Sequence, residues 1–385
     1  MPIKAVLLDL DGTLVANNAV VPGVEDMVTR LQQRGVAVFV ASNQPRLIGP
    51  EIKLSCIPEE NFLYYENVGV KKGGGRFVDT VCSGMGIRYN EIVYLGDSDN
   101  DMREAVRHQV ALFLAAWSAP TYKYGIPVRE PSHFAQIIET FFLKERLWYY
   151  KVDGADQLGR PVMVRALLSA TDCKQAGVQD LLKQKIPGPP VGRLSLGDFL
   201  SYHLLASVYL EGLHLRGTPG KPLIWCVYPA HLGGQTGVLV DFSVLMSRLL
   251  REQYRQDLLV RHRPAIKSAT ARYRGQHPPI GNQFQTVVLN TSSRDKIVGR
   301  TVIVLDDFTT YAQSFETARN LLLNAGAAEV IAVAVGKYNV PYMAQSLKDG
   351  VLLDSFAHNH LDADSFDQRE VNAVFDPQAV IRFAM

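Results

Sequence analysis

The chain has 385 residues, of which 47% are hydrophobic and 20% are charged, and its formal net charge is +2. This length exceeds the roughly 250–300 residues at which one core stops growing, so we expect two domains. The nearly balanced charge gives no general electrostatic case for a nucleic-acid or membrane partner, and no apolar stretch approaches the ~20 residues that cross a bilayer. Four widely spaced cysteines favour a reducing, cytoplasmic location.

The first predicted element is a buried strand over residues 3–8 that runs directly into Asp9 and Asp11. Positions i and i+2 of a strand point to the same side, and open α/β sheets bind ligands at the carboxyl ends of their strands. Two neighbouring carboxylates repel each other unless a proton or a cation neutralises them. Mg²⁺ takes carboxylate and phosphate oxygens together, so the pattern predicts phosphate chemistry beside Mg²⁺.

Strands and helices then alternate up to about residue 145. A helix is expected over Val24–Gln33, and strands are expected over residues 36–41, 92–95 and 110–115. This alternation predicts a doubly wound parallel sheet. Polar residues follow several of its strands, namely Ser42, the pair Lys71-Lys72 before three glycines, and Asp97 and Asp101 after Gly96.

These residues form the series DxDGT, Ser, Lys and GDxxxD, in that order. The series resembles the four motifs of the haloacid dehalogenase (HAD) superfamily of phosphatases. The resemblance implies that Asp9 is the nucleophile that forms an aspartyl-phosphate. It also implies that Asp11 is the general acid–base and that Ser42 holds a phosphate oxygen.

The same resemblance implies a lysine that neutralises charge in the transition state, and either Lys71 or Lys72 fits this role. Asp97 and Asp101 would complete a Mg²⁺ site with Asp9 and Asp11. The chain between the motifs is too short for a folded cap domain, which is typical of members that act on large or extended substrates. Two substrate classes stay open, a phosphorylated small molecule and a nucleic-acid end.

Residues 146–220 carry no chemical motif. Residues 186–190 predict a rigid turn, and residues 199–213 predict a buried or amphipathic helix. Three roles stay open for this segment: a hood over a substrate, a brace between domains, or the surface of a homodimer. It is also open whether the segment belongs to the second domain.

Residues 221–385 are predicted to form a second doubly wound α/β domain, so the fold class is α/β with two such domains. A buried strand over residues 300–305 is followed by Asp306 and Asp307, and then by a hydroxyl-rich turn that contains Thr309, Thr310 and Ser314. A helix is expected from residue 315 to residue 324. A strand, an acidic pair and a helix N-terminus predict a cradle for a phosphate monoester, although an ordinary helix N-cap stays an alternative.

This loop resembles that of the type I phosphoribosyltransferases, in particular the ComF-like members, which bind phosphoribosyl pyrophosphate (PRPP). Tyr311-Ala312 stands where the family has Thr-Gly, so the loop departs from the family pattern at one glycine. The resemblance implies that residues 227–230 form the pyrophosphate loop and that a basic segment with Arg263 and Lys267 closes over pyrophosphate. A solvated charge run or a nucleic-acid patch is the alternative for that segment.

The leading hypothesis is a bifunctional enzyme with Mg²⁺ as cofactor. The second domain would transfer phosphoribose from PRPP, or bind another ligand that carries ribose 5-phosphate, and the first would remove the phosphate from the product. One alternative is a nucleic-acid end phosphatase whose second domain senses PRPP or nucleotides, or binds nucleic acid, in repair or a stress response. Another is a regulatory module that binds nucleotide without turnover. His358 and His360 are interpreted as part of a polar loop.

Overall fold

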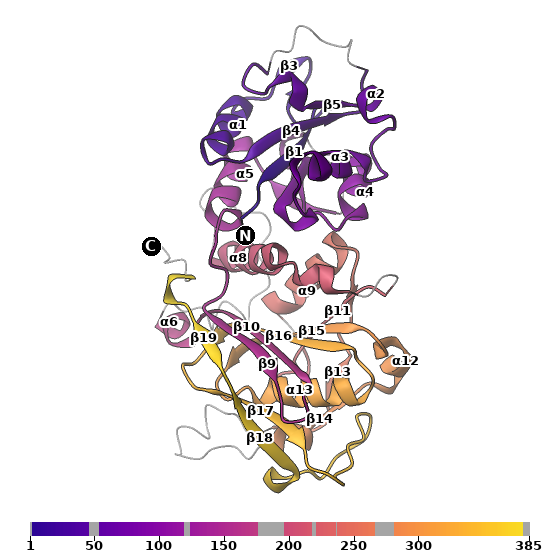
Figure 1. Cartoon of the computed structure of the whole chain (residues 1–385), viewed down its shortest axis with the longest axis vertical. Coiled ribbons are helices and arrows are strands. Elements are labelled where there is room, and N and C mark those ends of the chain that lie inside the picture. Colours follow the sequence, from indigo (N-terminus) through magenta and orange to yellow (C-terminus); the bar gives the residue numbers. More distant parts are fainter. Residues whose placement is uncertain are drawn as a thin grey trace.

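The computed structural model describes residues 2–45, 54–118, 124–175, 196–217, 221–235, 237–265 and 281–379. Two large β-sheets lie at opposite ends of the long axis, each with helices packed on it (Figure 1). The α/β class predicted from the sequence is confirmed. Among the described residues, no helix has both the length and the apolar character needed to span a membrane.

The first sheet is wholly parallel, as its apolar strands predict. Its strand order is β5-β4-β1-β6-β7-β8, and every residue of β1 is buried because helices cover both faces. Figure 1 shows helices α1 and α5 on one side of this sheet and α3 and α4 on the other. A small hairpin, β2–β3, follows β1. The elements of this half are β1 (Ala5–Asp9), β2 (Val15–Ala16), β3 (Ala19–Val20), α1 (Val24–Gln33), β4 (Ala37–Ser42), β5 (Phe62–Tyr64), α2 (Tyr65–Val68), α3 (Arg76–Met85), β6 (Ile92–Gly96), α4 (Asp99–Arg107), β7 (Leu112–Ala115), β8 (Ile126–Val128), α5 (Pro131–Ile137) and a π-helix (Ile138–Phe142).

The second sheet is mixed. Its order is β12-β11-β15-β16-β10-β9-β19, in which β9 and β19 run antiparallel to their neighbours and the other strands are parallel. Two strands thus come from residues 146–220. The elements are β9 (Tyr150–Ala155), β10 (Pro161–Ser169), α6 (Ala170–Gln175), α8 (Leu196–Glu211), β11 (Ile224–Val227), α9 (Val238–Leu249), β12 (Gln253–Tyr254), β13 (Leu259–Arg261), α11 (Gly281–Phe284), β14 (Val287–Leu289), α12 (Arg294–Ile297), β15 (Thr301–Thr309), α13 (Gln313–Asn324), β16 (Glu329–Lys337), β17 (Tyr342–Leu347), β18 (Phe366–Val371) and β19 (Ala373–Phe375).

Alternate residues of the central strands enter two different cores. Ile303 and Leu305 pack in the core that contains α8 and α9, whereas Val302 and Val304 pack in the core that contains α13. Successive side chains of a strand point to opposite faces, so a strand covered on both faces needs apolar residues at every position. This requirement explains the unbroken apolar run of β15.

The predicted end of β15 is wrong. The sequence predicts a strand over residues 300–305 that ends before the acidic pair, but β15 continues to Thr309 because β16 pairs with it as far as Thr309 and Lys337. Asp306 and Asp307 therefore lie on the strand itself. The turn between β15 and α13 has only residues 310–312.

Helix α8 packs between the two halves of the molecule (Figure 1). The hydroxyl of Tyr209 lies 2.6 Å from the carbonyl oxygen of Ile92 and accepts a hydrogen bond from the N–H of Ala111 at 3.2 Å. The side-chain amide of Asn90 donates to the carbonyl of Leu210 at 2.8 Å. Ile92 and Ala111 mark the amino ends of β6 and β7, so α8 covers the amino edge of the first sheet. Its carboxyl edge faces away from α8.

The region around α8 makes the fold sensitive to acid. His214 is 1% exposed and its ring stacks on Tyr209 with centroids 4.8 Å apart. Burial lowers the pKa of His214 to about 3, whereas an unfolded histidine has a pKa of about 6.5. Between these values the unfolded chain binds a proton that the folded chain does not bind. The folded state is therefore fully stable with respect to this residue above pH 6.5 and loses stability as the pH falls.

We expect His214 to lower the free energy of unfolding by about 2 kcal/mol between pH 6.5 and pH 5. His214→Phe keeps an aromatic ring beside Tyr209 and removes the titrating group. Urea unfolding at several pH values should show a shallower pH dependence for the variant over this window. Parallel pH curves for the two proteins would contradict the assignment.

Candidate active site

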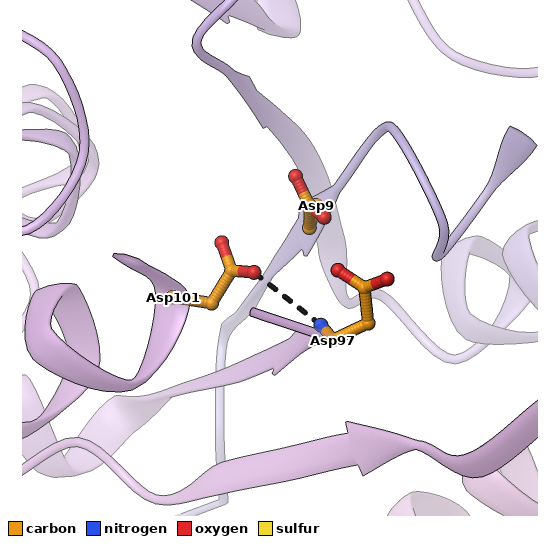
Figure 2. Close-up of side chains that lie close together, drawn as sticks. All are labelled: Asp9, Asp97 and Asp101. Atoms are coloured by element: carbon orange, nitrogen blue, oxygen red, sulfur yellow. Dashed lines mark hydrogen bonds between the residues drawn. The ribbon is translucent and has the colours of Figure 1, made fainter. Parts of the chain in front are cut away.

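Three carboxylates converge at the carboxyl edge of the first sheet. Asp9 ends β1, Asp97 follows β6, and Asp101 lies in the first turn of α4. One oxygen from each lies within 4.8 Å of the others. Figure 2 shows the three side chains around a common space, with the N–H of Asp97 donating to Asp101 at 3.3 Å. Three clustered carboxylates are a donor set suited to a hard divalent cation.

Lys72 lies among these carboxylates and is only 8% exposed. Its ammonium donates to Asp9 and, at 2.7 Å, to Asp101. Lys71 is exposed, with its ammonium 6.0 Å from the centre of the Tyr65 ring. The sequence left the choice between the two lysines open, and the geometry favours Lys72.

Asp101 is surrounded by donors. It is completely buried, and one carboxylate oxygen accepts from Lys72 and from the hydroxyl of Tyr94 at 2.8 Å. The other accepts from the backbone N–H of Ser98 at 3.0 Å. With both oxygens occupied in this way, Asp101 is better placed to fix Lys72 than to bind a metal directly. Asp9 and Asp97 are then the better candidates for metal ligands.

The other predicted residues lie around this group. Ser42 ends β4, is 1% exposed, and its hydroxyl accepts from the N–H of Gln44 at 3.0 Å. Asp11 is exposed, two residues beyond Asp9, and its carboxylate is not in the group of three. This exposure suits exchange of a proton with a substrate or water better than a role as a metal ligand. The hydroxyl of Thr13 donates to Asp9 at 3.4 Å.

The electrostatics of the group depend on burial. Burial, and then the charge of Asp101, raise the pKa of Asp9 well above its ordinary value, and Lys72 acts in the opposite direction. Burial also raises the pKa of Asp97. Burial removes the water that would stabilise the charged form of these carboxylates, and a bound cation stabilises that form instead. A divalent ion between Asp9 and Asp97 would lower both pKa values and keep both groups ionised.

Two contacts of the loop that carries Lys72 were not predicted from the sequence. The side-chain carbonyl of Asn43 accepts from the backbone N–H of Lys72 at 2.7 Å. Glu104, one helical turn after Asp101, is completely buried and binds backbone N–H groups of the loop that follows Lys72. The sequence shows Glu104 only as one acidic residue on a polar helix, because its burial and its partners depend on tertiary packing.

The second predicted site lies where β15 meets α13. The hydroxyl of Ser314 donates to Asp306 at 2.9 Å. Burial, followed by the charge of Asp307, raises the pKa of Asp306 well above its ordinary value. Thr309 is 3% exposed and ends the strand. Strand β11 runs parallel to β15 with Val227 opposite Leu305, so residues 228–230 emerge beside the acidic pair.

Two features shape the turn between β15 and α13. Ala312 has φ 57° and ψ 20°, a left-handed conformation that favours glycine. Ala312 thus adopts a backbone conformation that residues with a side chain adopt only rarely. Lys337 is completely buried and donates to the carbonyl of Thr310 at 2.8 Å and to that of Val340 at 2.6 Å. Burial lowers the pKa of Lys337 to about 8.

The predicted basic segment is only partly described. Arg263 is exposed and donates to the backbone carbonyl of Gln285 at 2.9 Å. Lys267 lies outside the described residues. His358 and His360 lie in a loop, as predicted, and the ring of His358 is centred 3.7 Å from that of His262.

No family model matches the sequence, and no curated protein matches it. Solved structures are similar to about a third of the chain. A HAD-superfamily hydrolase of subfamily IA from Geobacter sulfurreducens is 13% identical with a TM-score of 0.29, covering 35% of this chain and 99% of its own. The cobalt-bound deoxy-D-mannose-octulosonate 8-phosphate phosphatase from Haemophilus influenzae is 16% identical with a TM-score of 0.28, covering 36% of this chain and 87% of its own. The phosphoribosyltransferase resemblance stays a prediction from the sequence.

Proposed function

We propose that the first half of the chain is a divalent-metal-dependent phosphomonoester hydrolase. The observation that carries this proposal is the placement of Lys72 between Asp9 and Asp101, with Asp97 beside them, at the carboxyl edge of a parallel sheet. A carboxylate nucleophile, an ammonium and a carboxylate site for a cation are the groups that phosphoryl transfer requires.

Asp9 and Asp97 would hold the metal, and Mg²⁺ bound there would neutralise negative charge on the phosphate and on the carboxylates. The donor set fits this ion, since Mg²⁺ binds through one or two carboxylates together with phosphate and water.

Asp9 would attack the phosphorus atom, so that an Asp9–phosphorus bond forms as the ester P–O bond breaks. Asp11 would give its proton to the leaving oxygen. Asp11 would then take a proton from the water that attacks the aspartyl-phosphate, which releases inorganic phosphate and restores the Asp9 carboxylate. The exposed position of Asp11 allows both transfers.

Lys72 and Ser42 would bind the transferred group. The ammonium of Lys72 already lies against Asp9, so it would meet the phosphate oxygens on which charge develops. The hydroxyl of Ser42, at the end of the neighbouring strand, would donate to another phosphate oxygen.

The site favours no single substrate size. A cap domain would be inserted after Asp11 or between β4 and α3. The β2–β3 hairpin follows Asp11, and the described residues between β4 and α3 form only short elements, including β5 and α2. Phosphorylated small molecules are the proposed substrates. A nucleic-acid end is the alternative, and a substrate panel that includes an oligonucleotide with a terminal phosphate distinguishes the two.

Lys72→Ala should lower kcat for a phosphomonoester by about 100-fold or more, because the charge of the transferring phosphoryl group loses its counterion. Lys71→Ala, the adjacent exposed lysine, is the matched control and should stay within about threefold of the unaltered protein. Release of inorganic phosphate in the presence of Mg²⁺ measures the activity of both variants. The same assay after EDTA treatment tests the need for the metal. EDTA should abolish activity.

Circular dichroism should verify that the Lys72 variant is folded, since loss of the ammonium removes the cation that is paired with buried Asp9 and Asp101. Asp9→Asn, which preserves size, should also be folded and inactive. Equal losses in the Lys71 and Lys72 variants, or full activity of Asp9→Asn, would contradict the proposal.

We further propose that the second half binds PRPP and transfers its phosphoribosyl group. The observations in favour are the left-handed conformation of Ala312 and the Ser314–Asp306 hydrogen bond, which lie in a short turn between the carboxyl end of β15 and the start of α13. Backbone N–H groups and hydroxyls of this turn would hold the 5-phosphate. Asp306, whose carboxylate lies against the Ser314 hydroxyl, would face the sugar hydroxyls.

The two proposed sites would work independently. Asp9 lies at the carboxyl edge of the first sheet, a strand length of about 15 Å from the amino edge that α8 covers. The second half lies beyond α8 (Figure 1). A phosphoribosylated product would therefore reach Asp9 through solvent, and the phosphatase would accept the same compound when it is added from outside.

The conformation of Ala312 gives a test of PRPP binding. Ala312→Gly should bind PRPP within about threefold of the unaltered protein, because glycine adopts positive φ freely. Ala312→Val should bind about tenfold more weakly or worse, because a β-branched residue is strained there by 1–3 kcal/mol or so. Calorimetric titration with PRPP and Mg²⁺ measures both, and Asp9→Asn should bind as the unaltered protein does.

Absence of PRPP binding by the unaltered protein, or equal binding by the valine variant, would overturn this second proposal. PRPP binding without pyrophosphate release in the presence of candidate acceptors would favour the regulatory module over the transferase.

A further inference from the structure

Glu104 is a buried carboxylate held by backbone groups. It is completely buried on α4, and the two oxygens of its carboxylate accept hydrogen bonds from four backbone N–H groups. One oxygen accepts from Gly73 at 2.7 Å and from Gly75 at 2.9 Å. The other accepts from Phe77 at 2.7 Å and from Val78 at 3.3 Å.

These contacts fix the start of α3 and the glycine loop before it. The first N–H groups of a helix have no partner within the helix, and the N-cap residue Gly75 provides no side chain to satisfy them. Glu104 supplies the missing acceptors from a different helix, and its negative charge interacts favourably with the positive end of the α3 dipole.

The loop held in this way is the one that carries Lys72. The backbone N–H of Lys72 donates to Asn43, at the end of β4, and the next N–H along the chain, that of Gly73, donates to Glu104. The main chain is therefore anchored on both sides of the lysine. Its side chain extends from these anchors to Asp9 and Asp101.

The turn of α4 that carries Glu104 also carries Asp101, which binds the ammonium of Lys72. Asp101 and Glu104 are three residues apart on α4, so they lie on the same side of the helix. The loop also packs closely on the end of α4, since a Cβ on Gly75 would lie 2.5 Å from the ring of His108 and 2.8 Å from the side chain of Arg107. Helix α4 thus determines the position of both the backbone and the ammonium of Lys72.

We propose that Glu104 is a positioning residue for Lys72: it holds the glycine loop so that the ammonium meets the transferring phosphoryl group. This inference rests on the proposed hydrolase function and extends it to a residue outside the four motifs. A displacement of about 1 Å of a charge-stabilising group can cost about 100-fold in rate, so rigid anchoring of this loop has a catalytic consequence.

Glu104→Gln is the direct test. The side chain keeps its size, but its amide has one acceptor oxygen and an NH₂ group, so two of the four backbone N–H groups face a donor. The rate of phosphomonoester hydrolysis per folded molecule, kcat, should fall about tenfold or more. Mg²⁺ affinity, measured by calorimetry, should stay within about threefold, because the carboxylate of Glu104 binds backbone N–H groups of the loop and is not among the carboxylates that would hold the metal.

Glu91→Gln is the matched control. Glu91 is another buried carboxylate of the first half, 2% exposed, and it accepts from the backbone N–H of Arg88 at 2.9 Å near the amino edge of the sheet. Both variants should unfold at lower temperature. Only Glu104→Gln should lose kcat, and in a Lys72→Ala background it should cause no further loss, because its effect acts through Lys72.

A readout without turnover separates this inference from the proposed function. In ¹⁵N NMR spectra of the lysine side chains, the Lys72 ammonium should give a signal slowed in exchange by its two carboxylate partners. That signal should weaken or shift in Glu104→Gln and stay unchanged in Glu91→Gln.

An unchanged Lys72 signal in Glu104→Gln, equal losses of kcat in the two glutamine variants, or a full additional loss in the Lys72→Ala background would overturn the role of Glu104. A protein that hydrolyses no phosphomonoester but shows the expected Lys72 signals would instead overturn the proposed hydrolase function.

Discussion

The mutual repulsion of Asp9, Asp97 and Asp101 at one buried edge of a parallel sheet is the constraint on which the first half of the molecule depends. Lys72 offsets part of it through two ion pairs, and a divalent cation would offset more. The close packing of these carboxylates also restricts which residue can stand at position 12. Gly12 has φ 83°, and a Cβ there would lie 1.9 Å from a carboxylate oxygen of Asp97. Glycine after Asp11 is thus required both by backbone conformation and by space.

The sequence predicted the parts of this site that local pattern determines. Asp9 ends one apolar strand and Asp97 directly follows another, and the carboxyl ends of parallel strands share one edge. The choice between Lys71 and Lys72 could not be predicted, because the two are adjacent and only packing buries one of them. Glu104 was missed because its partners lie 26 to 31 residues away. The true end of β15 depends on its pairing with β16, which local sequence does not contain.

Helix α8 packs between the two halves of the chain (Figure 1). Of the three roles that the sequence left open for residues 146–220, a brace between the halves agrees with the contacts of Tyr209 and Asn90 across the amino edge of the first sheet. The same segment contributes β9 and β10 to the second sheet. This packing leaves the carboxyl edge of the first sheet, and with it Asp9, facing away from the second half. A link between the two proposed reactions would therefore be chemical, through a shared compound, and would not need a shared cavity.

In the proposed reaction, Asp9 carries the phosphoryl group between its two transfers. This role of Asp9 is tested most directly by acid quench of a single turnover, followed by mass spectrometry of the peptide that contains Asp9. We expect a phosphoryl group on Asp9 that appears before free phosphate and decays as phosphate forms. Complete hydrolysis with no phosphoryl group on Asp9 at any time, or with the group on another residue, would contradict this role.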